Sequence, residues 1–166
     1  MTTFTLVHVV LSLVGIGSGV VVLYGMIRGK RMDSGTALFL ATTVLTSLTG
    51  FFFPFHGVTP GIIVGVVSIV VLGAACYGRY VQNMAGAWRL VYVIGATVAL
   101  YFNVVVLIIQ LFEKVAGLKA LAPTQSEPPF IVIQIVVMAA FGVAGFLAVK
   151  RFRFDRAKAV EMAKAA

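Results

Sequence analysis

The sequence predicts an all-α integral membrane protein in which five transmembrane helices form a compact bundle. Of its 166 residues, 61% are hydrophobic and 11% are charged, whereas soluble domains carry roughly 25% charged residues. A membrane span needs about 20 mostly apolar residues, and five such runs follow one another along the chain. They cover residues 4–27, 35–53, 60–78, 90–112 and 130–149.

These runs leave no room for a separate soluble domain. We therefore expect residues 1–150 to form one five-helix transmembrane domain, and residues 151–166 to form a basic cytoplasmic tail that is helical or partly disordered. The N-terminal residues are uncharged and the first run has the length of a span. A cleavable secretory signal would instead begin with basic residues before a shorter apolar core, so we expect the first run to be kept as a span.

The positions of the charges predict the orientation of the bundle. Basic residues gather in the first gap, in the third gap and from residue 150 onward, and these regions together carry the net charge of +8, whereas the second gap has no Lys, Arg, Asp or Glu and the fourth is neutral. Because basic loops favour the cytoplasmic side, we expect the C-terminus inside and the N-terminus outside. The small size and the style of the chain suggest the cytoplasmic membrane of a bacterium.

Small residues in two spans predict how the helices pack. In hydrocarbon, helices associate through close backbone contact at residues such as glycine. Gly15 and Gly19 share one face of the first span, and Gly61 and Gly65 form a small-residue ridge on the third. The second span is instead rich in Thr and Ser, whose hydroxyls can bond to the preceding turn of their own helix or to a neighbour.

Several polar residues of the spans fall at similar depth once this topology is adopted. His8, His56, Gln110 and Gln134 all lie toward the outer end of their spans, and we interpret them as a candidate outer-leaflet polar cluster. Asn103 is the one strongly polar residue near mid-membrane. No Asp, Glu, Lys or Arg lies inside a predicted span, which argues against proton pumps, voltage sensors and carriers of charged solutes.

The two histidines support a specific cofactor hypothesis. Histidine is the usual axial ligand of b-type haem, His8 and His56 lie on different spans, and the glycines below His8 could leave room for a flat macrocycle. A structural role for each histidine, bonded to a serine, a carbonyl or water, is the simpler interpretation. A metal site is not predicted, because a closed site needs three or four ligands.

A proline-rich outer loop precedes the last span and should be stiff. It contains Pro123, Gln125, Glu127 and Pro128, and prolines restrict the backbone and prevent a helix from continuing. The next residue, Pro129, suits the first turn of a helix. The loop could cover the polar cluster as a lid or docking surface, or it could be only a rigid connector.

The sequence contains no catalytic motif, and its activity as an enzyme is left open with a preference against it. The leading hypothesis is a self-associating bundle, or an accessory subunit that binds another membrane protein. The alternatives are an oligomeric pore or small-solute transporter that uses Asn103 and the Thr-rich span, and a haem or quinone redox protein that uses His8 and His56. The bilayer, with anionic lipids at the basic tail, is the expected partner, and nucleic acid is not needed to explain the charge.

Overall fold

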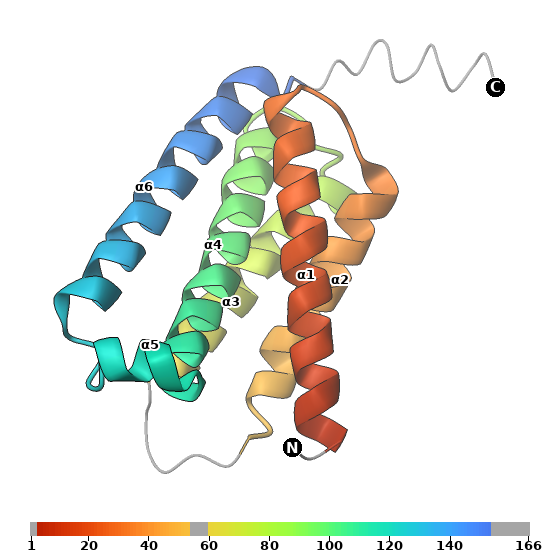
Figure 1. Cartoon of the computed structure of the whole chain (residues 1–166). Coiled ribbons are helices and arrows are strands. Elements are labelled where there is room, and N and C mark those ends of the chain that lie inside the picture. The colour runs from red at the N-terminus through yellow and green to blue at the C-terminus, as the bar shows by residue number, and fades with distance from the viewer. Residues whose placement is uncertain (1–2, 54–59, 154–166) are drawn as a thin grey trace.

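The apolar runs form helices in the computed structural model of the chain, which describes residues 3–53 and 60–153 (Figure 1). The helices are α1 (Thr3–Ile27), α2 (Asp33–Gly50), α3 (Pro60–Cys76), α4 (Trp88–Lys114), α5 (Ala116–Leu121) and α6 (Pro128–Arg151), and one π-helical turn, η1 (Tyr77–Val81), continues α3. The described residues contain no strand, which confirms the all-α prediction. The expected tail lies almost wholly outside the described residues, as does His56.

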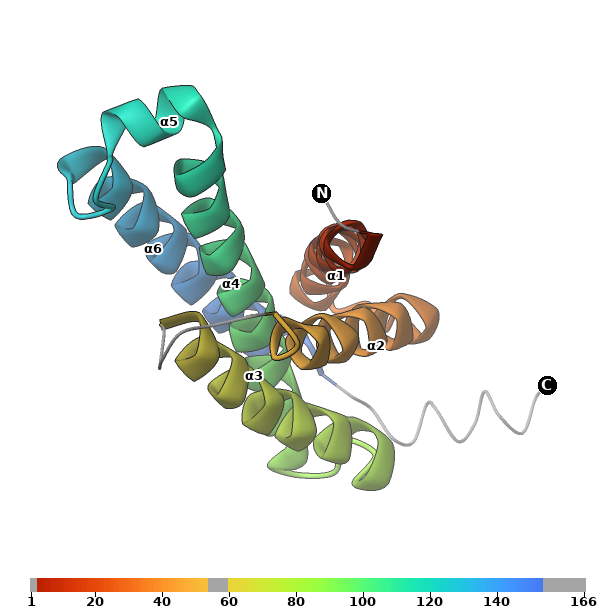
Figure 2. The same cartoon turned by 90° about the horizontal axis from the view of Figure 1, so that it is seen from below.

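The five long helices alternate in direction, so that neighbours along the chain run antiparallel (Figure 1). Helix α4 lies in the middle and contacts every other helix, while α1 packs against α2, α4 and α6 (Figure 2). Helix α6 approaches α4 closely near its C-terminal end and diverges from it toward the other end, where α5 bridges the two (Figure 1).

The helix ends follow local sequence signals. Helix α1 stops at Gly29, whose φ of +68° is readily adopted by glycine. The amides of Gly29 and Lys30 bond back to the carbonyls of Met26 and Gly25, which is the Schellman arrangement that closes a helix C-terminus. At the other end of the chain, Pro128 and Pro129 occupy the first turn of α6, where their missing amide hydrogens cost nothing.

Within the described residues, four segments are long and apolar enough to cross a membrane: α1, residues 62–81 of α3 and η1, α4 and α6. Helix α2 is as regular as these but is not among them, because five threonines and two serines lower its mean hydropathy. The outer surface is rich in large apolar side chains, and Val70, Val143 and Phe146 are each 58–68% exposed. The described chain is therefore a helical bundle of the multi-pass membrane type.

The larger of two buried apolar clusters lies toward the end of the bundle where α1 stops and α2 begins. It joins side chains of all five long helices, and its largest buried members include Phe39, Leu72, Tyr92 and Leu100. A smaller cluster at the opposite end contains Ile108, Phe112 and Ala122 and closes the space between α4, α5 and α6. The tightest packing is thus near the basic helix ends.

Candidate functional site

The basic residues of the first and third gaps and of the end of α6 gather at one end of the bundle, at the top of Figure 1. The ends of α1 and α6 lie side by side, because a Cβ added at Gly29, just after α1, would meet the carbonyl oxygen of Arg151 at the end of α6. The residues involved are Arg28, Lys30, Arg31, Arg79, Arg89, Lys150 and Arg151. We call this region the basic end.

One of these cations, Arg79, is buried, with its side chain only 3% exposed. It lies in η1, where the amide of Gln82 bonds to the carbonyl of Tyr77, five residues back. The neighbouring Gly78 packs so closely on α4 that a Cβ there would lie 3.1 Å from the carbonyl oxygen of Trp88. The wider turn and the glycine together place Arg79 between α2 and α4, and such π-turns are frequent at functional sites.

The guanidinium of Arg79 is held by an acidic residue and by aromatic rings. It donates to Oδ1 of Asp33, the first residue of α2. It also lies 4.9 Å from the ring centre of Tyr92 and 5.7 Å from that of Tyr80. Both are cation–π distances. A charge that would be costly to bury alone is therefore compensated on several sides.

Tyr92 extends this arrangement deeper into the bundle. Its side chain is 1% exposed, and its hydroxyl lies 3.3 Å from Oγ1 of Thr36 on α2, also a buried residue. On the other side its ring packs 6.1 Å from that of Phe152. Asp33, Thr36, Arg79 and Tyr92 form a polar network, which we call the Arg79 network, that ties together α2, η1 and α4.

A second arginine attaches α6 to the same end. Arg89, in the first turn of α4, donates from Nη1 to the carbonyls of Val149 and Phe152, at 3.0 and 2.5 Å. These carbonyls belong to the C-terminal end of α6, where cations are favourable because helix dipoles leave partial negative charge there. The two arginines together clamp four of the five long helices.

The Arg79 network is suited to holding helices together, because its members are bonded to one another across α2, η1 and α4. Within the described residues no group of three His, Cys, Asp or Glu side chains lies close enough to hold a metal ion. The network is thus a structural centre surrounded by exposed cations.

Three residues of the polar cluster predicted for the opposite half lie on α1, α4 and α6. His8 on α1 faces α2, where its Nδ1 lies 2.8 Å from Oγ1 of Thr49 and its ring stacks edge-on against Phe53. Gln110 and Gln134 are half-buried on α4 and α6. His56 lies outside the described residues, so its distance from His8 is not defined.

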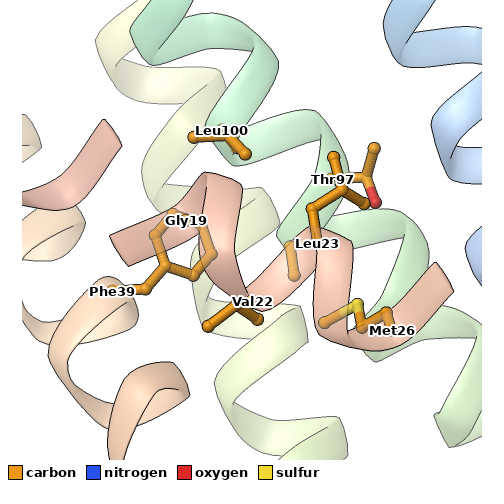
Figure 3. A pocket seen from close by; sticks show the side chains of 8 residues that line it. Gly19, Val22, Leu23, Met26, Phe39, Thr97 and Leu100 are labelled. Atoms are coloured by element: carbon orange, nitrogen blue, oxygen red, sulfur yellow. The ribbon is translucent and has the colours of Figure 1, made fainter. Parts of the chain in front are cut away.

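The room expected beside the glycines of α1 is filled by neighbouring helices. A Cβ at Gly15 would lie 3.2 Å from the hydroxyl oxygens of Thr42 and Thr43, and one at Gly19 would lie 2.6 Å from Leu100. The small pocket at Gly19 has no space for a water molecule (Figure 3). Gly15 and Gly19 thus serve close helix packing, and side chains of α2 and α4 occupy the space beside these two residues.

The mid-membrane residue Asn103 bonds across to α2. Its Nδ2 donates to Oγ1 of Thr43 at 3.3 Å. One turn further along α2, the hydroxyl of Thr46 is buried and has no hydrogen-bond partner. On the third span, Gly65 lies against the ring of Phe51, while Gly61 lies outside the residues whose burial is described. The side chains of Asn103, Thr43 and Thr46 thus place polar groups where α1, α2 and α4 meet.

The outer loop is braced by its own side chains. Glu127 accepts hydrogen bonds from Thr124 and Ser126, and Gln125, at a φ of +58°, donates from Nε2 to the carbonyl of Ile109 on α4. Desolvation alone would raise the pKa of Glu127, but the bonds from Thr124 and Ser126 outweigh it, so that its pKa lies below the ordinary value. A short helix, α5, precedes this loop and ends at Leu121, two residues before Pro123.

Sequence reasoning missed the Arg79 network. Arg79 and Tyr92 looked like ordinary residues at a span boundary and inside a span. The available signal was Asp33, which is the only acidic residue among the first 112 residues and lies between spans, where a basic partner is common. No protein-family model, curated protein or solved structure matches the chain.

Proposed function

We propose that the chain is a five-span membrane protein that works as a self-associating bundle or as an accessory subunit of a membrane complex, without catalytic activity of its own. The observation that carries this proposal is the exposure of α6. Within this helix only Ala148 is buried, and Val132 and Val143 are 57% and 61% exposed. A long apolar helix face that its own bundle leaves open suits contact with lipid or with another membrane helix.

The side-chain directions of α2 support a fifth span. Its threonines turn inward, with Thr36 and Thr43 1% and 0% exposed, while Leu38 and Leu45 turn outward and are 49% and 47% exposed. The hydroxyl of Thr42 also bonds to the carbonyl of Leu38 in its own helix. An apolar outer face over inner hydroxyls such as those of Thr42 and Thr43, which are hydrogen-bonded, suits hydrocarbon. The inward threonines therefore contribute to the low mean hydropathy of α2.

The charge asymmetry supports the orientation. The basic end faces the cytoplasm in this proposal, and the end with α5 and the loop around Pro123 faces outward. The host membrane is then a cell membrane, and the bacterial cytoplasmic membrane remains our proposal for a chain of this size.

Transport and redox chemistry are the two alternatives. Asn103 and the threonines of α2 bond within the bundle, so a solute path would have to form between copies. Liposome flux that Asn103→Leu changes would favour a pore or transporter. For haem bound by His8 and His56, a Soret band in protein expressed with added haem would be decisive.

Three open glycines provide a direct test of self-association. A Cβ at Gly17 on α1, Gly73 on α3 or Gly142 on α6 would meet nothing within 4 Å. Leucine at each site therefore changes one outer face without disturbing the inside of the bundle. We expect wild type to be oligomeric in mild detergent, and Gly142→Leu to shift it toward the monomer by at least about tenfold in dissociation constant, about 1.4 kcal/mol.

Gly17→Leu is the matched control, because it adds the same side chain to an equally open face of α1. It should retain the wild-type mass by native mass spectrometry or light scattering. A wild type that is monomeric at all concentrations and brings no other membrane protein through purification would contradict the proposed function.

A further inference from the structure

The outer surface between α3 and α4 contains an open apolar groove with a volume of about 480 Å³. That volume lies within the range of roughly 300–1,000 Å³ that is usual for small-molecule sites. All of its lining residues are apolar or glycine: Val71, Ala74, Ala87, Leu90, Val91, Ile94, Gly95 and Val98. Two of these lining residues, Ala74 on α3 and Gly95 on α4, are small.

The groove opens away from the rest of the bundle. In Figure 2, α3 and α6 flank α4, and among the described residues no other helix covers the side of α4 between them. Ile94, in the middle of the groove, is 52% exposed. In a membrane this opening faces lipid.

The length of the groove matches one leaflet. Along α4 it runs from Ala87 to Val98, which is about 16 Å at the rise of an α-helix. Half of a hydrocarbon core of about 30 Å is nearly the same length. One lipid chain occupies one leaflet, so a groove of this length accommodates one acyl chain.

The groove also begins at the basic end. Ala87 directly precedes the first turn of α4, where Arg89 lies and where the helix dipole favours negative charge. Trp88 and Tyr77 pack edge-to-face there with ring centres 5.0 Å apart, and such aromatic residues gather at the headgroup level. The cation Arg89 and the aromatic rings of Trp88 and Tyr77 at this position both suit a lipid with a negatively charged headgroup.

We propose that this groove binds one acyl chain of an anionic phospholipid, whose headgroup lies at the basic end beside the first turn of α4. Complementary shape along one leaflet holds the chain, and the cations at the basic end select the headgroup. The inference rests on the membrane location of the bundle and is independent of self-association.

The test measures retained lipid. The full chain is reconstituted in vesicles of equal phosphatidylglycerol and phosphatidylcholine with the same acyl chains, extracted in mild detergent and analysed by native mass spectrometry. Wild type should retain one phospholipid, with phosphatidylglycerol exceeding phosphatidylcholine several-fold. Ala74→Phe, which fills the groove, should lower that retention at least about fivefold, and Ala87→Leu at the other end should lower it independently if Ala74→Phe does not fold.

Val143→Phe is the control, because it enlarges an exposed side chain on α6 that lies outside the groove. This variant should retain lipid as wild type does. Equal lipid retention by Ala74→Phe and wild type would overturn the proposal, as would equal retention of the two phospholipids. A wild-type dimer that Ala74→Phe dissociates, with lipid retention unchanged, would also overturn it and assign the groove to a second copy of the chain.

Discussion

A buried guanidinium is the most demanding single residue of this bundle. Arg79 is almost completely enclosed, yet Asp33 lies at the protein surface with its side chain 61% exposed. The long side chain of Arg79 therefore extends through the packed end of the bundle, and its charge lies toward the headgroup side, where it pairs with Asp33. Long cationic side chains near helix ends commonly extend in this way. Tyr92 adds a ring face on the inner side.

Removing this charge should destabilise the bundle. We expect Arg79→Leu to lower the free energy of unfolding by about 2–3 kcal/mol, through the loss of a charged hydrogen bond and of a cation–π contact. Asp33→Asn should cost about 1 kcal/mol, because the asparagine oxygen can still accept from Arg79 and the exposed carboxylate that it replaces is screened by water. Unfolding in mixed micelles with increasing dodecyl sulfate, followed by circular dichroism, measures both.

Arg31→Gln is the matched control for these substitutions. Arg31 donates to the same oxygen of Asp33 at 2.6 Å, but its side chain is 44% exposed, so its loss should cost no more than about 0.5 kcal/mol. An equal effect of Arg31→Gln and Arg79→Leu would show that burial adds nothing, and the Arg79 network would lose its structural role.

The sequence predicts the structural role of some single residues but not of others. Gly15 and Gly19 could be assigned to a packing face because helical periodicity alone places them together. The Arg79 network could not be predicted in this way, since Asp33 and Arg79 are 46 residues apart and meet only when α2, η1 and α4 come together. The same holds for His8: its place along α1 follows from the sequence, but its partner Thr49 on α2, 41 residues away, does not.

At the scale of helices, the contact of α1 with α2 and α4 depends on Gly19. The ring of Phe39 and the methyl groups of Leu100 fill the space where a side chain at Gly19 would lie (Figure 3). Adding one methyl group there forces two buried side chains to move, and overpacking of this kind costs about 1–3 kcal/mol.

We therefore expect Gly19→Ala to lower the free energy of unfolding by about 1–3 kcal/mol. Unfolding in mixed micelles with increasing dodecyl sulfate measures this change. Gly17→Ala, two residues earlier on an open face of α1, should change it by no more than about 0.5 kcal/mol. If both alanine variants were as stable as wild type, the close approach of α1 to α2 and α4 would be wrong.

Helix α2 and η1 show the limits of reading elements from hydropathy. The sequence placed a helix over residues 35–53, close to the observed Asp33–Gly50, yet mean hydropathy does not distinguish an inward polar face from a water-exposed one. The π-turn has no local signal, because it arises from the contact of Gly78 with the carbonyl of Trp88 on the next helix. Local pattern thus determines where these helices form and, at α1 and α6, where they end, whereas the π-turn at η1 has no such signal.

At the scale of the whole molecule, the charges define a polarity along the bundle axis. The sequence predicted that basic gaps share one side, and the antiparallel arrangement of the five long helices brings those gaps to one end. Function is less predictable, since neither a motif nor a relative accompanies the fold, and a groove shaped by Ala74 and Gly95 on separate helices is invisible in a linear sequence.

The proposed topology makes one decisive prediction about α2. If α2 crosses the membrane, reporters fused after Gly29 and after Gly57 lie on opposite sides, since α2 is the only long helix between these two positions. A reporter that is active only in the cytoplasm should report after Gly29 and at the C-terminus, and should be silent after Gly57 and after Lys119. The basic residues near Gly29 keep that end of the bundle on the cytoplasmic side of the membrane. A signal after Gly57 equal to that after Gly29 would mean that α2 does not cross, and silence at the C-terminus would reverse the orientation of the whole bundle.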